Sequence, residues 1–215
     1  MRMRLFGKLL NLIPNKRVRE ITRHAGYAAE DAARHGIYEA DRSARFAEAE
    51  RTGERITCAE FSVLPATLTE LMASPYNDLR TPINTAALFV VALNVYNQNR
   101  EEAIAMINYL RGSNTMSVED VRFLDESLAK NNAENRLARS YLEGATPQNG
   151  YTPSQPNTVV VIDNPYTYLA TNSGVKEYAN LLVQCGGTDE PRSITMKNAG
   201  DLWYLWEYTD LLNEI

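Results

Sequence analysis

The feature that most constrains this fold is an almost wholly apolar stretch of helical length in the middle of the chain. It follows Thr81-Pro82, a pair typical of a helix start, because threonine caps free backbone N–H groups and proline fits the first turn. Its apolar residues are Ala86, Ala87, Leu88, Phe89, Val90, Val91, Ala92, Leu93 and Val95. A helix that is apolar on every side must be surrounded by protein. The sequence therefore predicts a central buried helix over residues 82–96.

Helix signals also flank this stretch, so residues 60–142 are predicted to be helical. Pro65 precedes a short apolar segment at 66–72, and a last helical stretch runs to about Leu142. Two pairs mark helix starts, and the first resembles the capping box, in which the side chains at the two ends of the first turn bond each other's backbone N–H groups. These pairs are Asn99 with Glu102 and Ser117 with Asp120, and Gly112 is the expected stop between them.

The last third of the chain reads as strands. The expected strands are Thr158–Ile162, Tyr178–Cys185, Ser193–Lys197 and Leu202–Tyr208. A turn at residues 198–201 joins the last two into a hairpin, and short connections of this kind favour antiparallel pairing. Helices first and strands last predict an α+β fold: a helical N-terminal half packed on a C-terminal antiparallel sheet of about four strands.

Both tryptophans, Trp203 and Trp206, lie in the last expected strand. Because side chains alternate between the two faces of a strand, one of the two is expected to face the core. The set that contains Leu202, Tyr204 and Trp206 is the favoured core face, and the orientation of Trp203 stays open.

A loop without charges connects the expected helices to the expected sheet. Residues 144–162 contain no charged residue, and 143–157 read as irregular structure with prolines at 147, 153 and 156. Prolines restrict the backbone and so lower the entropy cost of presenting a fixed surface. We therefore expect Tyr151, Gln155 and Tyr166 to be candidate partner-binding residues. The alternative is that the loop only bridges the two halves of the fold.

The N-terminal segment differs from the rest of the chain in charge and composition. Residues 1–23 contain seven basic residues and one acid, a net of +6, so with −5 overall the remaining residues carry −11. One helical face of the first 13 residues is apolar and is the candidate membrane or partner face: Leu5, Phe6, Leu9, Leu10 and Ile13. From about Lys16 to Arg51, small residues recur every three or four positions, which predicts a long alanine-rich helix that Gly53 ends. We therefore divide the chain into an arm at 1–55 and an α+β domain at 56–215.

Several kinds of chemistry lack their sequence signatures. The motifs GxSxG, HExxH, GxxxxGK[ST] and GxGxxG do not occur, and Cys58 and Cys185 belong to no CxxC pair. His24 and His35 would lie about 16 Å apart along one helix, too far to share a metal ion. We therefore expect no catalytic residue, cofactor or metal site, and free thiols. The acidic body argues against a nucleic-acid partner, which needs a basic surface.

Several segments resemble one family of sequences. They are EGATP (143–147), YTPSQP (151–156), NPY (164–166), GG (186–187), PRSITMK (191–197) and GDLWYLWE (200–207). With these motifs the chain resembles a bacterial family of uncharacterised domains, a domain of unknown function, from about Phe61 to the end. The resemblance implies no activity, ligand or partner.

Two hypotheses about function follow. The first is a non-enzymatic protein-interaction or adaptor module, cytoplasmic, whose helical arm binds a protein partner, a second copy of the chain or a membrane surface. The second is a hydrolase-type enzyme with its site near loop 144–157. An enzyme would need a pocket where acid and base groups converge, and this loop carries none itself.

Overall fold

The computed structural model describes residues 43–130, 135–164, 166–170 and 174–215. The chain divides into two compact units, Met1–Glu48 and Ala49–Ile215. Residues 43–52 are helical, and the Glu54 N–H donates to the Ala49 carbonyl (2.9 Å) across Gly53, whose φ is 75°. This left-handed conformation suits glycine and confirms the predicted helix stop. The rest of the predicted long helix lies outside the described residues.

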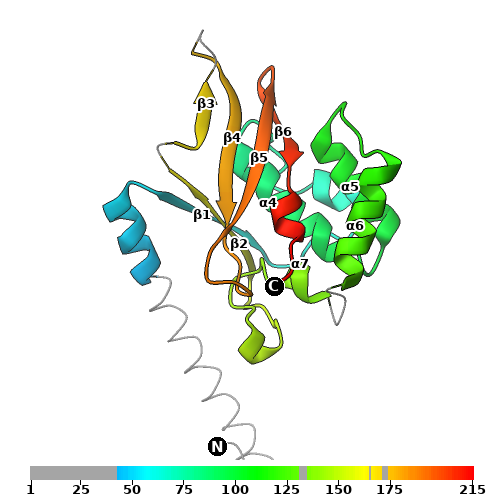
Figure 1. Cartoon of the computed structure of the whole chain (residues 1–215), viewed down its shortest axis with the longest axis horizontal. Helices are drawn as coiled ribbons and strands as arrows, with labels where there is room; N and C mark the ends of the chain where they lie inside the picture. The colour runs from blue at the N-terminus through cyan, green and yellow to red at the C-terminus, as the bar shows by residue number, and fades with distance from the viewer. Residues whose placement is uncertain (1–42, 131–134, 165, 171–173) are drawn as a thin grey trace, which may run out of the picture. The chain divides into compact units, whose positions relative to one another are not determined.

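A six-stranded antiparallel sheet forms one layer of the second unit (Figure 1). Its strands are β1 (Arg55–Phe61), β2 (Asn157–Asp163), β3 (Tyr168–Ala170), β4 (Lys176–Val183), β5 (Arg192–Ala199) and β6 (Leu202–Glu207). The strand order is β1-β2-β4-β5-β6, and β3 pairs with β4 beside this path. The predicted turn at residues 198–201 does join β5 to β6 as a hairpin.

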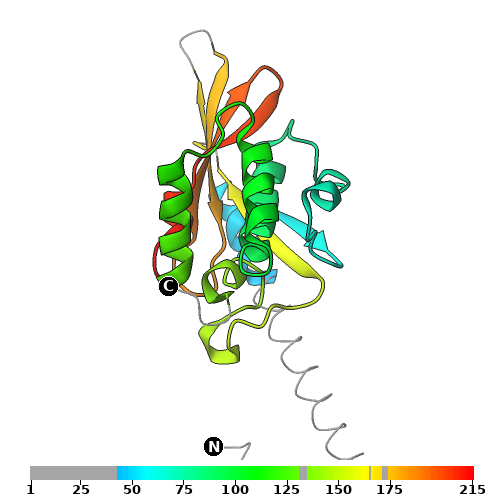
Figure 2. The same ribbon diagram turned by 90° about the vertical axis from the view of Figure 1, so that its right-hand side faces the viewer.

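Helices form the second layer, on one side of the sheet (Figure 2). The α-helices that follow β1 are α3 (Leu68–Met72), α4 (Pro82–Val95), α5 (Arg100–Arg111), α6 (Val118–Lys130) and α7 (Arg136–Arg139), and the short 3-10 helices are η2 (Pro147–Asn149) and η3 (Thr209–Leu212). Helix α4 contacts β1, β2, β4, β5 and β6, so it lies across the sheet, and α5 packs on α4. The α+β class is therefore confirmed.

The predicted caps are present where the structure describes them. The Thr81 side chain accepts the Asn84 N–H at the start of α4 (3.4 Å). The Asn99 side chain accepts the Glu102 N–H (3.2 Å), but the Glu102 side chain accepts the Leu68 N–H (2.7 Å) instead of that of Asn99, so this pair is an N-cap and not a capping box. Helix α5 ends at Gly112 with a φ of 62°. The Ser117 and Asp120 side chains each bond the other's backbone N–H, as a capping box requires.

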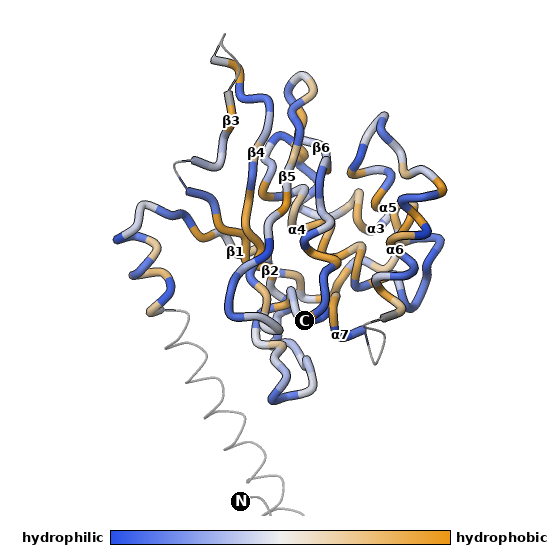
Figure 3. Tube along the Cα trace, viewed as in Figure 1, coloured by the Kyte–Doolittle hydropathy of each residue, from blue (hydrophilic) through white to orange (hydrophobic). Residues whose placement is uncertain are grey.

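The hydrophobic core is built around α4 (Figure 3). Every α4 residue from Thr85 to Val95 is buried, and Leu88, Phe89 and Val91 have no exposed surface. The buried faces of the strands pack against this helix through residues such as Val159, Val161, Leu181 and Ile194. The sequence prediction of a central buried helix is confirmed.

The sheet differs from the prediction of about four strands because β1 and β3 were missed. Strand β1 pairs with β2 over seven residues, yet its apolar residues do not alternate: Ile56 and Cys58 share one face, and Ala59 and Phe61 the other. Strand β3 has only three residues, too few for a periodic pattern. Residues 60–142 are consequently not helical from their start, since β1 ends at Phe61. No helix among the described residues is long and apolar enough to span a bilayer.

Candidate binding sites

The loop before β2 is held in place by one asparagine. The Asn149 Oδ1 accepts the backbone N–H groups of Thr146 (3.0 Å) and Thr152 (3.1 Å). Its Nδ2 donates to the carbonyls of Gly144 (2.8 Å) and Thr152 (2.9 Å). One amide thus forms four hydrogen bonds within a short segment, so side-chain bonding as well as proline gives this loop a fixed shape.

A cavity of about 580 Å³ lies beside this loop, at the C-terminal end of α4. We call it the amide pocket, because five of its ten lining residues carry a side-chain amide. Its lining residues are Leu64, Asn94, Asn97, Gln98, Asn135, Arg139, Leu142, Thr152, Pro153 and Asn157. Among these residues Arg139 has the only ionisable side chain, so the pocket offers neutral donors and acceptors rather than charge.

Hydrogen bonds fix the part of the amide pocket that lies between α4 and α7. The Asn94 Nδ2 donates to the Val90 carbonyl (3.0 Å) and to the Ala138 carbonyl (2.9 Å), which ties α4 to α7. In return the Asn135 Nδ2 donates to the Asn94 carbonyl (3.1 Å). Another part of the lining is attached to the sheet, because Leu142 forms an isolated β-bridge with Val159 of β2. The pocket is therefore an open hollow at the surface, whose inner side is formed by the buried Asn94, Leu142 and Asn157.

A second cavity, of about 410 Å³, lies at the opposite, N-terminal end of α4. We call it the cationic pocket. Its lining residues are Arg55, Thr57, Arg80, Thr81, Pro82, Ile83, Asp163, Tyr168, Lys176 and Trp203. They come from the start of α4 and from one end of strands β1, β2, β3, β4 and β6.

An ion pair forms part of the cationic pocket. Arg55 reaches both carboxylate oxygens of Asp163, from Nη2 (2.6 Å) and Nε (3.2 Å), and the Asp163 side chain is wholly buried while that of Arg55 is 73% exposed. The hydrogen bond to Asp163 and its charge raise the pKa of Arg55. Burial, with the charge of Asp163, raises the pKa of Tyr168, so its phenol stays protonated and can donate.

The outer face of the sheet carries an edge-to-face aromatic pair, Tyr178 and Trp206, which corrects the prediction for Trp206. Trp203 and Leu205 face the core, whereas Trp206 is 42% exposed. Trp206 lies 6.2 Å from the Tyr178 ring, and Lys197 lies over both rings. Leu202 and Tyr204 of the favoured set do pack against the core as partly buried residues, but the prediction for Trp206 was wrong. Strand β6 pairs with β5 with a register shift between Thr195 and Met196, which the sequence of β6 alone does not predict.

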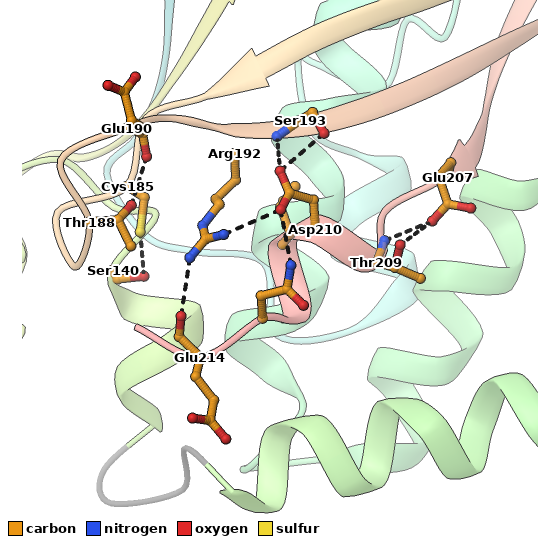
Figure 4. Close-up of polar contacts among 12 residues, drawn as sticks. Ser140, Cys185, Thr188, Glu190, Arg192, Ser193, Glu207, Thr209, Asp210 and Glu214 are labelled. Atoms are coloured by element: carbon orange, nitrogen blue, oxygen red, sulfur yellow. Dashed lines mark hydrogen bonds and ion pairs between the residues drawn. The ribbon is translucent and has the colours of Figure 1, made fainter.

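A polar cluster fastens the C-terminal segment to β5 (Figure 4). The Asp210 carboxylate accepts the N–H (2.7 Å) and hydroxyl (3.0 Å) of Ser193, and it also pairs with Arg192 (3.3 Å). Burial alone would raise the pKa of Asp210, but the hydrogen bonds from Ser193 and Asn213, together with the charge of Arg192, outweigh it and hold the pKa below its ordinary value. We call this cluster the C-terminal latch.

The two cysteines are not joined in a disulfide: Cys185 is buried and Cys58 is partly buried. The buried Cys185 sulfur lies 3.3 Å from the Ser140 hydroxyl (Figure 4). The next residue, Gly186, donates its N–H to the Ser140 carbonyl (2.7 Å), and a Cβ there would collide with the Ala145 carbonyl oxygen. The GG motif thus permits a close approach of two backbones.

The predicted partner-binding residues do not form one surface. Tyr151 is buried, with 7% of its surface exposed, whereas Gln155 is exposed and its amide donates to Asn157 (3.3 Å). Tyr166 is 86% exposed and lies beyond the far end of β2, a strand about 20 Å long. Tyr151 and Gln155 are not among the lining residues of the amide pocket, although their loop neighbours Thr152 and Pro153 are. The buried ring of Tyr151 leaves little of that side chain for a partner.

The N-terminal candidates cannot be placed. The predicted apolar face, Leu5, Phe6, Leu9, Leu10 and Ile13, lies outside the described residues, as do His24 and His35. Within the part of the chain that the structure describes, no group of three His, Cys, Asp or Glu side chains could hold a metal ion.

Sequence reasoning missed the residues that build both pockets. One signal was present for the amide pocket: three amide residues, Asn94, Asn97 and Gln98, occur within five positions at the end of an apolar helix. The cationic pocket had no local signal, because Arg55, Arg80, Asp163 and Lys176 are far apart in sequence.

Fold and cavities together define an α+β domain with one buried central helix and a pocket at each of its ends. The chain belongs to the family DUF6935, a domain of unknown function, whose family model matches residues 63–215. This confirms the resemblance to a domain of unknown function. No curated protein and no solved structure matches the sequence significantly.

Proposed function

We propose that the α+β domain is a non-enzymatic protein-interaction module that holds an extended segment of a partner protein in the amide pocket. The observation that carries this proposal is the lining of the pocket, with five side-chain amides and one ionisable group. Its volume of about 580 Å³ is within the range of about 300–1,000 Å³ typical of ligand sites.

Side-chain amides match the chemistry of a peptide backbone. Each Asn or Gln offers two N–H donors and a carbonyl acceptor, and each peptide unit presents one donor and one acceptor. Both N–H groups of Asn94 are already donated within the fold, so an extended segment would bond through its main chain to the exposed amide of Gln98. In strand addition, main-chain bonds of this kind supply much of the affinity. Leu64, Leu142 and Pro153 add apolar surface for side chains of the segment.

The pocket is also held in shape before any ligand enters. The bonds of Asn94 to Val90 and Ala138 fix the helical wall, and the four bonds of Asn149 fix the loop wall. Walls that are ordered in advance reduce the conformational entropy lost on binding. A module that presents such a pocket can bind a partner without folding on it.

The hydrolase alternative gains no support from this pocket. General acid–base catalysis requires side chains that give and take protons near the reacting atoms. Of the residues that line the cavity beside loop 144–157, only Arg139 ionises, and an arginine stays protonated at neutral pH. The lining suits recognition better than proton transfer.

In this proposal the N-terminal segment attaches the α+β domain to a partner, a second copy of the chain or a membrane surface. Its apolar face at Leu5, Phe6, Leu9, Leu10 and Ile13 has Arg2, Arg4 and Lys8 beside it, a pattern typical of helices that bind a partner, a second copy or an anionic membrane surface. Retention on anionic vesicles separates these modes. If the membrane mode operates, removal of residues 1–15 abolishes retention and added salt weakens it; equal retention of both chains contradicts it.

The test of the pocket is peptide selection followed by calorimetry on the full chain. A random hexapeptide display library is the probe, and the selected peptides are titrated into wild type and Gln98→Ala. We expect a loss of affinity of about fivefold or more, because one neutral hydrogen-bond partner contributes about 1 kcal/mol. Gln148→Ala is the matched control: Gln148 is exposed on η2 and is not among the pocket residues, so its variant should bind as wild type does.

Two results would contradict the proposal. One is a selected peptide that binds Gln98→Ala as tightly as wild type. The other is a library that yields no binder while a neutral oligosaccharide binds and depends on Gln98. That outcome would keep the pocket but assign it a ligand that is not a protein.

A further inference from the structure

The cationic pocket concentrates positive charge on an acidic domain. Three of its lining side chains are cationic, Arg55, Arg80 and Lys176, and Asp163 is the one carboxylate among them. The lining therefore carries a net charge of +2, whereas residues 24–215 carry −11 in total. Such a concentration of one sign attracts a ligand of the opposite sign.

The single carboxylate does not neutralise all three cations. Both oxygens of Asp163 are taken up by Arg55. The Lys176 Nζ lies 4.0 Å from the centre of the Tyr168 ring, and among the residues that the structure describes no ion pair joins it to a carboxylate. The backbone N–H of Arg80 donates to Asp78 (3.0 Å), but no ion pair joins the Arg80 guanidinium to a carboxylate of the described residues. Within the part of the chain that the structure describes, two of the three cations that line the cavity thus have no carboxylate partner.

The remaining walls suit an organic group. The Tyr168 and Trp203 rings meet edge to face, with their centres 5.8 Å apart. Pro82 and Ile83 line the cavity from the first turn of α4, while Thr57 and Thr81 add hydroxyl groups. The start of α4 also carries the positive end of the helix dipole.

We propose that the cationic pocket binds a small organic phosphate monoester. A phosphate monoester carries a charge of about −1.5 to −2 at pH 7, which matches the net charge of the lining. The planar fork of Arg80 fits two phosphate oxygens, and Lys176 supplies a second charged donor. The aromatic and apolar walls receive the organic part. This site is independent of the amide pocket, from which it is separated by the length of α4.

The test is calorimetric titration of the full chain with phenyl phosphate. Phenyl sulfate has the same shape but a single charge, and inorganic phosphate lacks the organic part, so the three probes separate charge from apolar contact. We expect phenyl phosphate to bind tightest, and its affinity to fall with added salt because the interaction is between charges.

The variants Arg80→Gln and Lys176→Met should each weaken phenyl phosphate binding by about tenfold or more, the effect of one charged hydrogen-bond partner. Lys197→Met is the matched control. Lys197 also lies over an aromatic ring, at 4.2 Å from the centre of Trp206, but it is not among the pocket residues. Its variant should bind as wild type does.

Clear outcomes overturn the assignment. Absence of saturable binding at millimolar phenyl phosphate, or an equal loss in Lys176→Met and Lys197→Met, removes the site. Equal affinity for phenyl phosphate and phenyl sulfate removes the preference for a dianion. Equal affinity for phenyl phosphate and inorganic phosphate contradicts the proposal that the aromatic and apolar walls bind the organic part of the ligand. Because Gln98 is at the other end of α4, a failed peptide test leaves all these results unaffected.

Discussion

The two pockets share one scaffold but are built from opposite kinds of side chain. Helix α4 and strand β2 contribute to both: Ile83 and Asp163 line the cationic pocket, and Asn94 and Asn157 line the amide pocket. Three cations and one carboxylate line the pocket at the N-terminal end of α4. Five amides and one arginine line the pocket at its C-terminal end.

The difference shows how the ends of a buried helix can be used. The free N–H groups at its N-terminus favour an anion, and the cationic pocket adds arginine and lysine to that field. Neutral amides can instead enter the core without an ion pair, provided that they are hydrogen-bonded, as Asn94 is. One helix thus separates a charged pocket from a neutral one on the same domain.

A charge in the middle of α4 should remove both pockets, and this is the largest effect that we expect. Leu88 has no exposed surface, so Leu88→Asp places a carboxylate in the core without a partner. The variant should show no cooperative unfolding transition by circular dichroism. Val91→Ala, a milder change on the same helix, should cost about 2 kcal/mol and leave peptide and phosphate binding in place. Wild-type melting of Leu88→Asp would contradict the central role of α4.

Asp163→Asn should act on the charged pocket alone. Loss of the carboxylate breaks the ion pair with Arg55, at a cost in unfolding free energy of about 2–3 kcal/mol, because Asp163 is wholly buried. The net charge of the lining rises from +2 to +3, so the variant should bind phenyl phosphate more tightly than wild type does.

The control for Asp163→Asn is Asp125→Asn, which breaks an exposed ion pair with Arg100. This variant should cost at most about 1 kcal/mol in urea unfolding. Equal losses for the two variants would show that burial does not distinguish these two pairs.

Asn149→Ala should act on the neutral pocket alone. The substitution removes four hydrogen bonds in an exposed loop, and we expect a loss of about 1.5 kcal/mol together with weaker peptide binding. Phenyl phosphate binding should not change, since the loop is not part of the cationic pocket. Gln148→Ala, its neighbour without a role in the loop, should match wild type in both assays. A loss of phosphate binding in Asn149→Ala would show that the two pockets are coupled.

The helix caps and four of the six strands could be predicted from the sequence, whereas β1, β3 and the orientation of Trp206 could not. Each predicted cap depends on residues three or four positions apart, as Thr81 with Asn84 and Ser117 with Asp120 show, so local chemistry decides it. The phase of β6 depends instead on its pairing with β5, including a register shift that the strand's own sequence does not contain. That is why Trp206 was assigned to the wrong face.

The pockets could be predicted only in part, for the same reason. The loop at 143–157 was recognised as a candidate site, and the amide pocket borders it through Thr152 and Pro153. The prediction selected Tyr151 and Gln155 because their side chains can form hydrogen bonds with a partner. Which side chains face a cavity depends on contacts such as those of Asn149, and Arg55 meets Asp163 only because β1 pairs with β2 in the observed register.

The smallest effect should come from the C-terminal latch, which lies outside both pockets. Asp210→Asn should cost about 1 kcal/mol at pH 7, since the carboxylate is partly exposed and solvent screens it. The pKa of Asp210 is lowered in the folded protein, so its contribution is complete above the unfolded value of about 3.9 and is lost as pH falls through the folded value. Urea unfolding of wild type and variant should therefore differ equally at pH 7 and pH 5, and the difference should shrink below about pH 4. Peptide and phosphate binding should be unchanged at pH 7. A difference that grew toward acid pH would show that the neutral form of Asp210, rather than the carboxylate, is the one the fold stabilises.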